Sequence, residues 1–444
     1  MKTPIYDFVQ NYINSDAVRF HMPGHKGISH LGCEALDITE INGADVLYSP
    51  SGIIAESERN AASLFGSAQT FYSAEGSSLA IRAMLGTVCE SRAGKRITVL
   101  AARNAHKAFL YSCALLNIDI EWIFPSEFSH ICASPITSDE LRAKLGKMKE
   151  KPSAVYVTLP DYLGNIADIR GLSAVCDEFS LPLLVDNAHG AYLAFLQPSL
   201  HPIALGATAC CDSAHKTLPV LTGGAYLHFS EKAPKEYIAN ARKYLSLFAS
   251  TSPSYLILQS LDLFNAQAKG YKEQLEICAE KVKNIKARIS DLGFFFIGNE
   301  PMKLTVDAKR SGLSGDELGE ALREQGIECE FSDPDYLVLM VTPENSERDF
   351  ERLLAAFENI TAREPIAPQK FELTAPRVAM SVREAILSPS RNIPVREAVG
   401  KVCAAPALSC PPAVPAVVSG EIIDESLVRL MEYYGTETID IIDE

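Results

Sequence analysis

The chain has 444 residues and carries 41 Lys and Arg against 56 Asp and Glu, a formal net charge of −15 at pH 7. This acidic balance argues against a nucleic-acid-binding protein that relies on a basic surface. With 47% hydrophobic and 22% charged residues, the composition is that of a globular protein and excludes a disordered chain. The length allows one large domain accompanied by smaller ones.

The start of the chain and its cysteines predict a cytoplasmic protein without a membrane segment. Polar residues interrupt the first dozen positions, so there is no apolar signal-peptide core, and no uncharged apolar run reaches about 18 residues. The 11 cysteines are an odd number and contain no Cys-x-x-Cys pair. We expect reduced cysteines that pack as small apolar residues, among them Cys89, Cys113 and Cys176.

Between residues 60 and 230, short apolar runs alternate with helical patterns, which predicts a parallel sheet covered by helices on both faces. The expected strands are 97–101, 118–124, 154–158, 181–186 and 224–229. The expected helices are 77–90, 105–117 and 171–179, the last with a clear 3.6-residue apolar period.

After residue 251 the pattern changes to a long helical stretch over 252–292. A compact α+β unit follows, with strands at 303–306 and 336–342 and helices at 315–325 and 346–358. The tail contains a Pro-rich segment at 404–415, which excludes a regular helix or a central strand there, and a last helix near 425–434.

One buried strand ends in an acid, Asp186, and His189 follows three residues later. Open α/β sheets bind ligands at the carboxyl ends of their strands, so this carboxylate is placed to pair with a cationic ligand atom. A strand-end aspartate that caps a turn is an equally good interpretation of the residue taken alone.

A second motif, Ser213-Ala214-His215-Lys216, precedes the glycine pair Gly223-Gly224. A lysine in a small polar setting between apolar segments can have a lowered pKa and act as a Schiff-base nucleophile. Most lysines are solvated surface charges, so this position needs support from its neighbours.

Two helix starts add to the pattern. Gly76-Ser77-Ser78 opens a helical stretch, where hydroxyls and backbone N–H groups can bind a phosphate, although Ser also serves as a plain N-cap. His106 follows a strand and begins a helix, which could set its imidazole over a ring bound at the sheet edge; a solvated or capping histidine is the alternative.

The order of these motifs along one α/β sheet resembles that of the fold-type I pyridoxal-phosphate enzymes. Further stretches narrow the resemblance to the ornithine/lysine/arginine decarboxylases in their short bacterial form, and it spans nearly the whole chain. These stretches are Phe20-His21-Met22-Pro23-Gly24-His25-Lys26-Gly27, Ala44-Asp45-Val46-Leu47 with Ser51-Gly52, Thr251-Ser252-Pro253-Ser254-Tyr255, and Ser409-Cys410-Pro411-Pro412 leading to Gly420-Glu421.

The resemblance implies an α/β fold of the aspartate aminotransferase type, with a mainly parallel sheet in the large domain and smaller α+β C-terminal domains. It predicts an N-terminal segment at 1–55 that contributes to a dimer and its active site, and a pyridoxal-phosphate-binding large domain at 56–270. A small α+β domain at 271–365 and a C-terminal domain at 366–444 complete the predicted organisation.

The resemblance also implies roles for the motif residues. Lys216 binds the aldehyde of pyridoxal 5'-phosphate covalently and exchanges it for the substrate amine, and Asp186 keeps the pyridine nitrogen protonated, which makes the ring an electron sink. His106 stacks on the ring, and His189 supports the Asp186 carboxylate or faces the substrate. Cofactor contacts are further expected from Gly76, Ser77, Ser78, Ser213 and His215, with Thr251 and Ser252 supplied across a dimer interface.

The implied activity is the decarboxylation of lysine, ornithine or arginine to an amine and carbon dioxide, as in polyamine biosynthesis, by a homodimer or a dimer-based oligomer with shared sites. Candidates for reading the distal cation of the substrate are Glu421, Glu330 and Asp333.

The loop with His21, His25 and Lys26 is expected near a subunit interface at the mouth of the site. Two histidines four apart on a helix can share a metal, but Pro23 and Gly24 oppose a helix between them, so we expect no metal site here.

The sequence departs from the family pattern at Glu75, Asn187, Tyr192 and Asp212. A carboxylate at position 75 either points away from a phosphate or weakens its binding. Because Lys216, Asp186, His106 and His215 remain, we expect an active enzyme.

Two alternatives stay open: another reaction on the same scaffold, such as transamination or β-elimination, and a non-catalytic relative that acts as a scaffold or regulator. The first lacks a recognisable arginine motif for clamping an α-carboxylate. A dinucleotide-binding dehydrogenase is excluded because no Gly-x-Gly-x-x-Gly follows a strand, and a P-loop because Gly94-Lys95 is followed by Arg96.

Overall fold

The computed structural model describes residues 1–91, 94–125, 130–133, 136–371, 375–406 and 414–443. The chain divides into two compact units. The first consists of Met1–Ile97, Pro152–Leu159 and Ile169–Glu273, and the second of Thr98–Lys151, Pro160–Asp168 and Gln274–Glu444.

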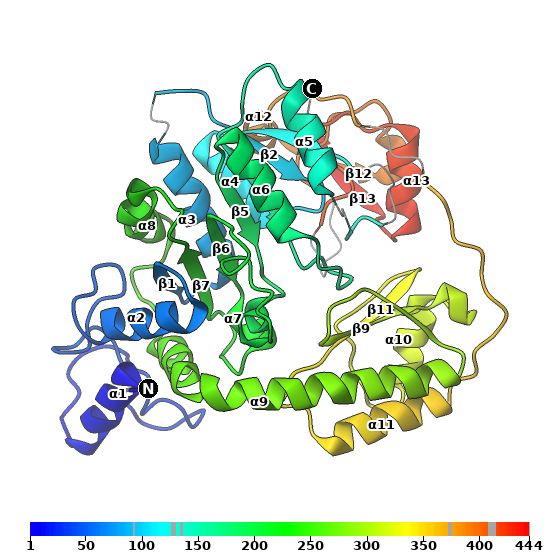
Figure 1. Ribbon diagram of the computed structural model, residues 1–444. Coiled ribbons are helices and arrows are strands. Elements are labelled where there is room, and N and C mark those ends of the chain that lie inside the picture. The colour runs from blue at the N-terminus through cyan, green and yellow to red at the C-terminus, as the bar shows by residue number, and fades with distance from the viewer. Residues whose placement is uncertain (92–93, 126–129, 134–135, 372–374, 407–413, 444) are drawn as a thin grey trace. The chain divides into compact units, whose positions relative to one another are not determined.

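The first unit is built around five adjacent strands (Figure 1). Their order is β1 (Gln69–Ser73), β7 (Ala225–Phe229), β6 (Ala209–Asp212), β5 (Leu183–Asp186) and β4 (Ala154–Thr158). The three strands β4, β5 and β6 are parallel, whereas β7 is antiparallel to both of its neighbours. Nearly every residue of these strands is buried, as expected for strands covered on both faces.

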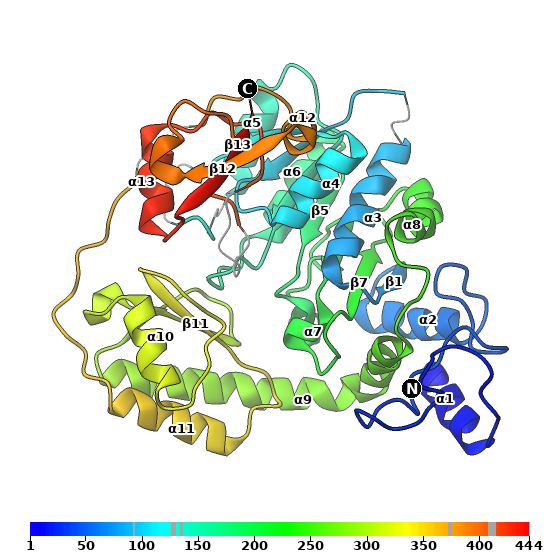
Figure 2. The ribbon, with the colours of Figure 1, turned by 180° about the vertical axis from the view of Figure 1, so that it is seen from behind.

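Helices of the first unit are α1 (Pro4–Asn14), α2 (Ile53–Phe65), α3 (Gly76–Ser91), α6 (Ile169–Phe179), α7 (Ala214–Thr217) and α8 (Lys235–Phe248), with a 3₁₀ turn η1 (Ala191–Phe195). Helix α3 packs on β6 and β7 and runs beside α8 (Figure 2). Gly86 permits this approach, because a Cβ there would lie 2.3 Å from the ring of Tyr244.

In the second unit, β2 (Thr98–Ala102) and β3 (Asp119–Ile123) pair in parallel and are joined by α4 (Lys107–Leu116); α5 (Ser138–Lys147) follows. A four-stranded antiparallel sheet has the order β10 (Phe331–Ser332), β11 (Tyr336–Met340), β9 (Lys303–Asp307) and β8 (Phe295–Ile297). The neighbouring elements are η2 (Lys309–Ser311), α10 (Gly315–Arg323) and α11 (Glu347–Glu358). The long helix α9 (Tyr255–Asp291) contributes to both units, since their boundary falls at residue 273.

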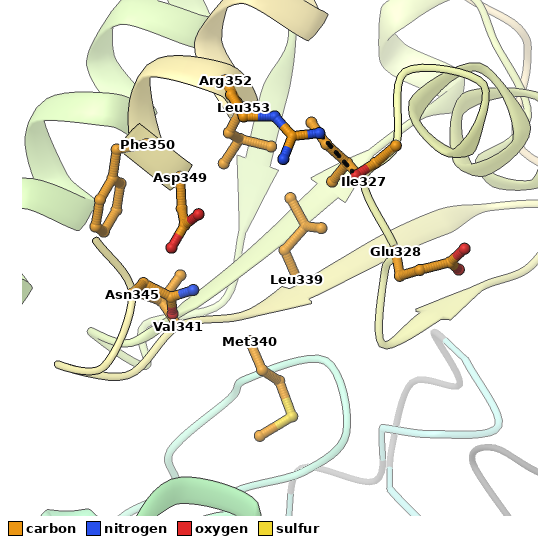
Figure 3. Close-up of a pocket in the computed structure, with 11 residues that line it drawn as sticks. Ile327, Glu328, Leu339, Met340, Val341, Asn345, Asp349, Phe350, Arg352 and Leu353 are labelled. Carbon is orange, nitrogen blue, oxygen red and sulfur yellow. Dashed lines mark hydrogen bonds between the residues drawn. The ribbon is translucent and has the colours of Figure 1, made fainter. Parts of the chain in front are cut away.

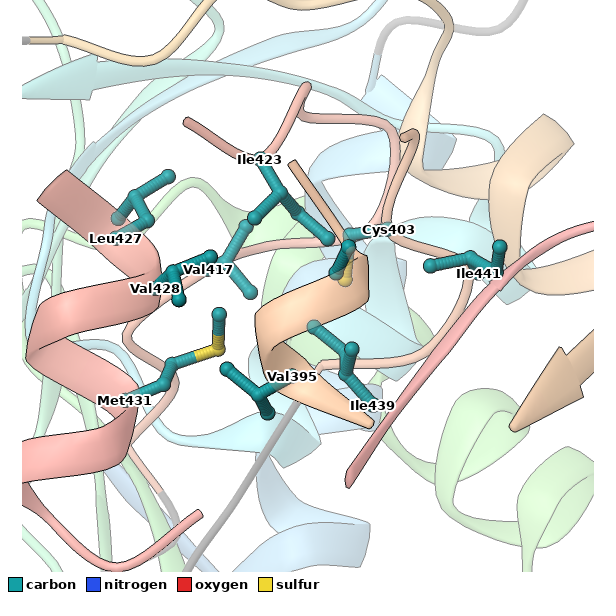
Figure 4. Packing of buried hydrophobic residues seen from close by; sticks show 10 residues of the cluster. Val395, Cys403, Val417, Ile423, Leu427, Val428, Met431, Ile439 and Ile441 are labelled. Atoms are coloured by element: carbon teal, nitrogen blue, oxygen red, sulfur yellow. The ribbon is translucent and has the colours of Figure 1, made fainter. Parts of the chain in front are cut away.

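The C-terminal part of the second unit contains α12 (Val382–Leu387), the antiparallel pair β12 (Ser390–Pro394) and β13 (Thr438–Ile442), η3 (Val395–Glu397) and α13 (Glu425–Tyr433). These elements enclose their own apolar core (Figure 4). Its members include Val395, Cys403, Val417, Ile423, Leu427, Met431, Ile439 and Ile441.

The expected strands and helices occur within a few residues of their predicted positions. The sequence pattern missed other elements, among them β1, β6, β12, β13, α5 and α8. Strand β7 is antiparallel, because it is linked to β6 through only the four-residue α7, which is too short to form a covering crossover helix. Ser409–Pro412 and most of the Pro-rich segment 404–415 lie outside the described residues.

Two further observations concern the helices and the cysteines of the described residues. Within the described ranges, no helix has both the length and the apolar character required to span a bilayer. The cysteines of those ranges are all free, with Cys113 and Cys176 buried and Cys89 half-buried.

Candidate active site

The centre of the site is the buried carboxylate of Asp186 at the carboxyl end of β5. Its Oδ2 accepts a hydrogen bond from the Tyr156 hydroxyl at 3.2 Å, and its Oδ1 accepts one from the Ala188 N–H at 3.2 Å. The Cys211 thiol on β6 lies 3.7 Å from Oδ1. Burial raises the pKa of Asp186, and the charge of Lys216 opposes this rise. A buried acid in this setting is stabilised by a cationic partner.

Lys216 lies at the end of the short helix α7, and its Nζ is 2.9 Å from Nε2 of His189. His189 is buried and follows Asp186 by three residues. The charge of Lys216 also acts on the Asp186 carboxyl, so the two groups lie near each other. The structure therefore brings together three of the predicted catalytic residues.

The predicted phosphate residues also meet. Ser213, the N-cap of α7, donates its hydroxyl hydrogen to Ser77 Oγ at 2.7 Å, and Ser77 and Ser78 lie in the first turn of α3. Gly76 has a φ of +70°, a backbone conformation that favours glycine. Its N–H donates to the Gly223 carbonyl at 2.7 Å. Two hydroxyls at the N-terminus of a 16-residue helix suit a phosphate group.

His215 contacts the glycine pair Gly223-Gly224, which also accepts the Gly76 N–H. Its Nδ1 lies 3.0 Å from the Gly224 carbonyl oxygen and donates to it. Burial lowers the pKa of His215, the hydrogen bond to Gly224 opposes this, and the charge of Lys216 adds to the lowering. A neutral ring with its hydrogen on Nδ1 follows.

Glu75 is engaged by the loop that precedes α9. Its Oε1 accepts a hydrogen bond from the Ser250 N–H at 2.7 Å, and the Ser252 N–H donates to Ser250 Oγ at 3.2 Å. Glu75 therefore ties the α3 start to the segment that carries Thr251 and Ser252, all of which are exposed.

His106 belongs to the second unit, whereas the residues described so far belong to the first. It is the N-cap of α4, and its Nδ1 accepts a hydrogen bond from the Ala108 N–H at 3.1 Å. The capping alternative is thus realised, and stacking on a bound ring stays a prediction.

Two departures from the family pattern contact each other. Asn187 donates through Nδ2 to Oδ1 of Asp212 at 2.7 Å, while Oδ2 of Asp212 lies 2.9 Å from His201 Nε2 and 3.3 Å from His228 Nε2. Burial opposes the charged form of Asp212, but the two histidines outweigh it and hold the pKa of this carboxyl well below its usual range. Tyr192, the remaining departure in this region, is buried in η1.

The acids considered for the distal cation are all engaged within the second unit. Glu421 pairs with Arg103 at 3.0 Å, Glu330 accepts from the Tyr162 hydroxyl at 2.7 Å, and Asp333 pairs with His130 at 2.6 Å.

The N-terminal histidines do not share a helix, because residues 21–27 form turns. His21 Nε2 lies 2.6 Å from the Tyr12 hydroxyl and His25 Nε2 lies 3.2 Å from Asp37 Oδ2. The Lys26 amine donates to the backbone carbonyl of His21.

Two other groups bring ligand-type atoms within 4.8 Å of one another: His201, Cys210 and Asp212, and His130, Asp333 and Asp335. In both, the histidine is already hydrogen-bonded to a carboxylate of its own group.

A pocket lies in the second unit between β11, α11 and the segment at 326–328 (Figure 3). Its floor is apolar, with Leu339 and Phe350, and Arg352 on its rim donates to the Gly326 carbonyl at 3.1 Å. The expected site residues are absent from its lining.

Sequence reasoning missed the partners that hold the site residues, namely Tyr156, Cys211, His201 and His228. They lie on strands or loops with ordinary apolar neighbours and have no motif spacing. The strand register pairs Cys211 directly with Asp186, whereas Tyr156 lies opposite Leu184 and reaches Asp186 through its hydroxyl.

Comparison with known proteins agrees with this geometry. Residues 3–299 match the family described as Orn/Lys/Arg decarboxylase, major domain. An arginine decarboxylase of Bacillus subtilis is 30% identical over 458 residues, covering 96% of this chain and 92% of that protein.

Among solved structures, the constitutive lysine decarboxylase of E. coli is similar with a TM-score of 0.77 and 17% identity, covering 100% of this chain and 82% of that one. The lysine decarboxylase of Francisella novicida has a TM-score of 0.80 and 16% identity, with 99% and 81% covered. The predicted α/β fold class is confirmed. The chain belongs to the Orn/Lys/Arg decarboxylase family.

Proposed function

We propose that the protein is a pyridoxal-phosphate-dependent decarboxylase that converts lysine, ornithine or arginine into the corresponding amine and carbon dioxide. The observation that carries this proposal is the grouping of Lys216, His189 and Asp186, in which the amine contacts an imidazole at 2.9 Å and interacts with a buried acid. Family membership supports the reaction class.

The described residues fit pyridoxal phosphate. Asp186 offers a buried carboxylate for the pyridine nitrogen, Lys216 an amine for the aldehyde, and Ser77 and Ser213 hydroxyls for the phosphate. When bound there, the cofactor supplies an electron sink for the pair left behind as the carboxylate departs. His189 can take up or return a proton at Nε2, which keeps the Lys216 amine neutral when it acts as a nucleophile.

The remaining assignments of cofactor residues belong to the same proposal. His106 would stack on the ring, His215 and the α3 turn at Gly76 and Ser78 would support the phosphate, and a second copy would supply Thr251 and Ser252.

We further propose a homodimer with shared sites, located in the cytoplasm. The segment between residues 18 and 31 exposes large apolar side chains, including Phe20 at 94% and Leu31 at 89%, and a second copy would remove this surface from water. The free cysteines agree with a reducing compartment. The four-segment organisation, with boundaries at 55, 270 and 365, is part of this proposal.

The decisive experiment is a carbon dioxide release assay with lysine, ornithine and arginine in the presence of added pyridoxal phosphate, with the products identified by chromatography. We expect one of the three to yield an amine. Formation of a keto acid without carbon dioxide would establish transamination instead, and would contradict the proposal.

A spectroscopic assay tests the site itself. We expect the purified protein to show a visible absorbance band with pyridoxal phosphate, Lys216→Ala to lose it, and the exposed control Lys235→Ala to keep it. A wild-type protein that takes up no cofactor would favour a non-catalytic relative.

A further inference from the structure

The segment that leads into α4 is held by the C-terminal part of the chain. Arg103, between β2 and α4, donates through Nη2 to Glu421 Oε2 at 3.0 Å and to the Ala416 carbonyl at 3.2 Å. The same guanidinium lies over the ring of Trp122, 5.0 Å from its centroid. Glu421 is buried and also accepts the Val418 N–H at 2.7 Å. This is an ion pair withdrawn from water, with both partners further hydrogen-bonded.

The other end of α4 is held by the same C-terminal part. Arg383 of α12 donates through Nη1 to the carbonyls of Ala114 at 2.6 Å and Leu115 at 3.2 Å. These carbonyls belong to the last turn of α4, and a cation there adds a donor and complements the helix dipole. Helix α12 packs directly on α4.

Glu421, which binds Arg103, lies between two residues of a packed apolar core. Val417 and Ile423, on either side of Glu421, are both fully buried in the C-terminal apolar core (Figure 4). The Glu421 carboxylate is therefore anchored to this core, while the other end of α4 is held by Arg383 of α12.

His106 begins the helix that is held in this way. It caps α4, and its Nδ1 accepts the Ala108 N–H at 3.1 Å, so the orientation of its ring depends on the placement of the first turn of α4.

We infer that the C-terminal domain positions His106 by clamping α4 at both ends, with Glu421 and Arg383 as the positioning residues. This rests on the proposed function, in which His106 stacks on the cofactor ring. The structure gives Glu421 an internal role in place of direct reading of the substrate, because its Oε2 already serves Arg103 and Val418.

The first test uses Trp122, the sole tryptophan of the chain, as a reporter of Arg103. Glu421→Gln keeps the side-chain size and removes the charge that anchors Arg103. We expect a shifted Trp122 emission and at least about tenfold faster amide hydrogen exchange in α4, because a buried ion pair has lost one partner. The matched control is Glu425→Gln, whose side chain is 79% exposed, and it should match the wild type.

Arg383→Met removes only the two hydrogen bonds at the far end of α4 and provides an independent variant if Glu421→Gln does not fold. We expect faster exchange at the C-terminal turn of α4 and an unchanged Trp122 emission. Wild-type emission and wild-type exchange in both variants would overturn the clamp.

The second test asks whether the clamp acts through His106. The dissociation constant for pyridoxal phosphate is measured for Glu421→Gln, His106→Ala and the double variant. We expect each single variant to bind about tenfold more weakly and the double variant to be no weaker than His106→Ala, because the two changes remove one and the same contact. Additive effects would overturn the positioning of His106.

Failure of the proposed function would be visible separately. If the wild-type protein takes up no pyridoxal phosphate, the cofactor assignment is wrong and with it the role given to His106. Trp122 emission and α4 exchange would then still decide whether the C-terminal domain holds the helix.

Discussion

Nζ of Lys216 and Nε2 of His189 are 2.9 Å apart, so the amine and the imidazole share one hydrogen bond. Only one of the two nitrogens carries the shared proton at a time. The imidazole is therefore placed to accept a proton from the charged amine. The strand-end turn after Asp186 and the short helix α7 are the elements that set this distance.

His189→Asn should lower the rate of decarboxylation by about 10²- to 10⁴-fold, because a group that transfers protons is replaced by one that does not. Cofactor uptake should persist, since Lys216, Asp186 and the serines remain. Rapid-quench carbon dioxide release and the absorbance of the bound cofactor check this. The exposed His30→Ala serves as the control, and an unchanged rate in His189→Asn would contradict a proton-transfer role.

Ser213→Ala and Ser77→Ala should each weaken pyridoxal phosphate binding by about tenfold, because each removes a hydroxyl that can donate to an anion. The same variants should bind pyridoxal, which has no phosphate, as the wild type does. Fluorescence titration with the two ligands distinguishes these cases, and Ser290→Ala on the exposed face of α9 is the control. Equal weakening for both ligands would place the hydroxyls away from the phosphate.

Asp212→Asn should reduce the free energy of unfolding at pH 7 by about 3 kcal/mol, because His201, His228 and Asn187 all lose their charged acceptor. The pKa of Asp212 is depressed in the folded state, so its contribution is fully present above its ordinary value of 3.8 and is lost only as pH falls below it. Urea unfolding at pH 7 should therefore show this difference from the wild type. Asp177→Asn, in an exposed pair with Lys232, should change little.

Asp262 on α9 should show the opposite pH dependence. Its Oδ2 accepts the N–H groups of Ile5 and Tyr6 at the start of α1, at 2.8 and 3.0 Å, and burial raises its pKa to about 6 against hydrogen bonds that lower it. The folded state thus takes up a proton between pH 6 and 3.8, which stabilises it as the pH falls. The stability of the wild type relative to Asp262→Asn should rise from pH 7 to 4.5 in urea titrations. A constant difference would show that Asp262 is charged throughout.

Much of the site could be predicted because Asp186 and Lys216 follow strands of one sheet, whose carboxyl ends meet at one edge. The groups that hold them could not. His228 lies on β7 opposite Cys210 and contacts Asp212 through the antiparallel register of β6 and β7, which no local pattern encodes.

The role of Glu421 could not be predicted from the sequence for a different reason. A buried acid in the tail is consistent with a substrate contact or with an internal ion pair, and the choice depends on which cation lies opposite. Here Arg103, more than 300 residues earlier in the chain, fills that place, and its separation in sequence hides the pair. The sequence pattern also missed β1 and β6, although they are as long as strands that it did predict, with five and four residues.

The pairing of β1 with β7 sets the order of events during synthesis. Gln69 pairs with Phe229. About 160 further residues must therefore be synthesised after β1 before its partner strand β7 is complete. Until then its backbone groups are open to pairing with other chains, while local hydrogen bonds from the Tyr72 N–H to Glu58 and from the Tyr72 hydroxyl to the Ser57 carbonyl connect it to α2. A nascent chain that stalls before Phe229 would therefore expose an unpaired edge strand, which is a template for aggregation.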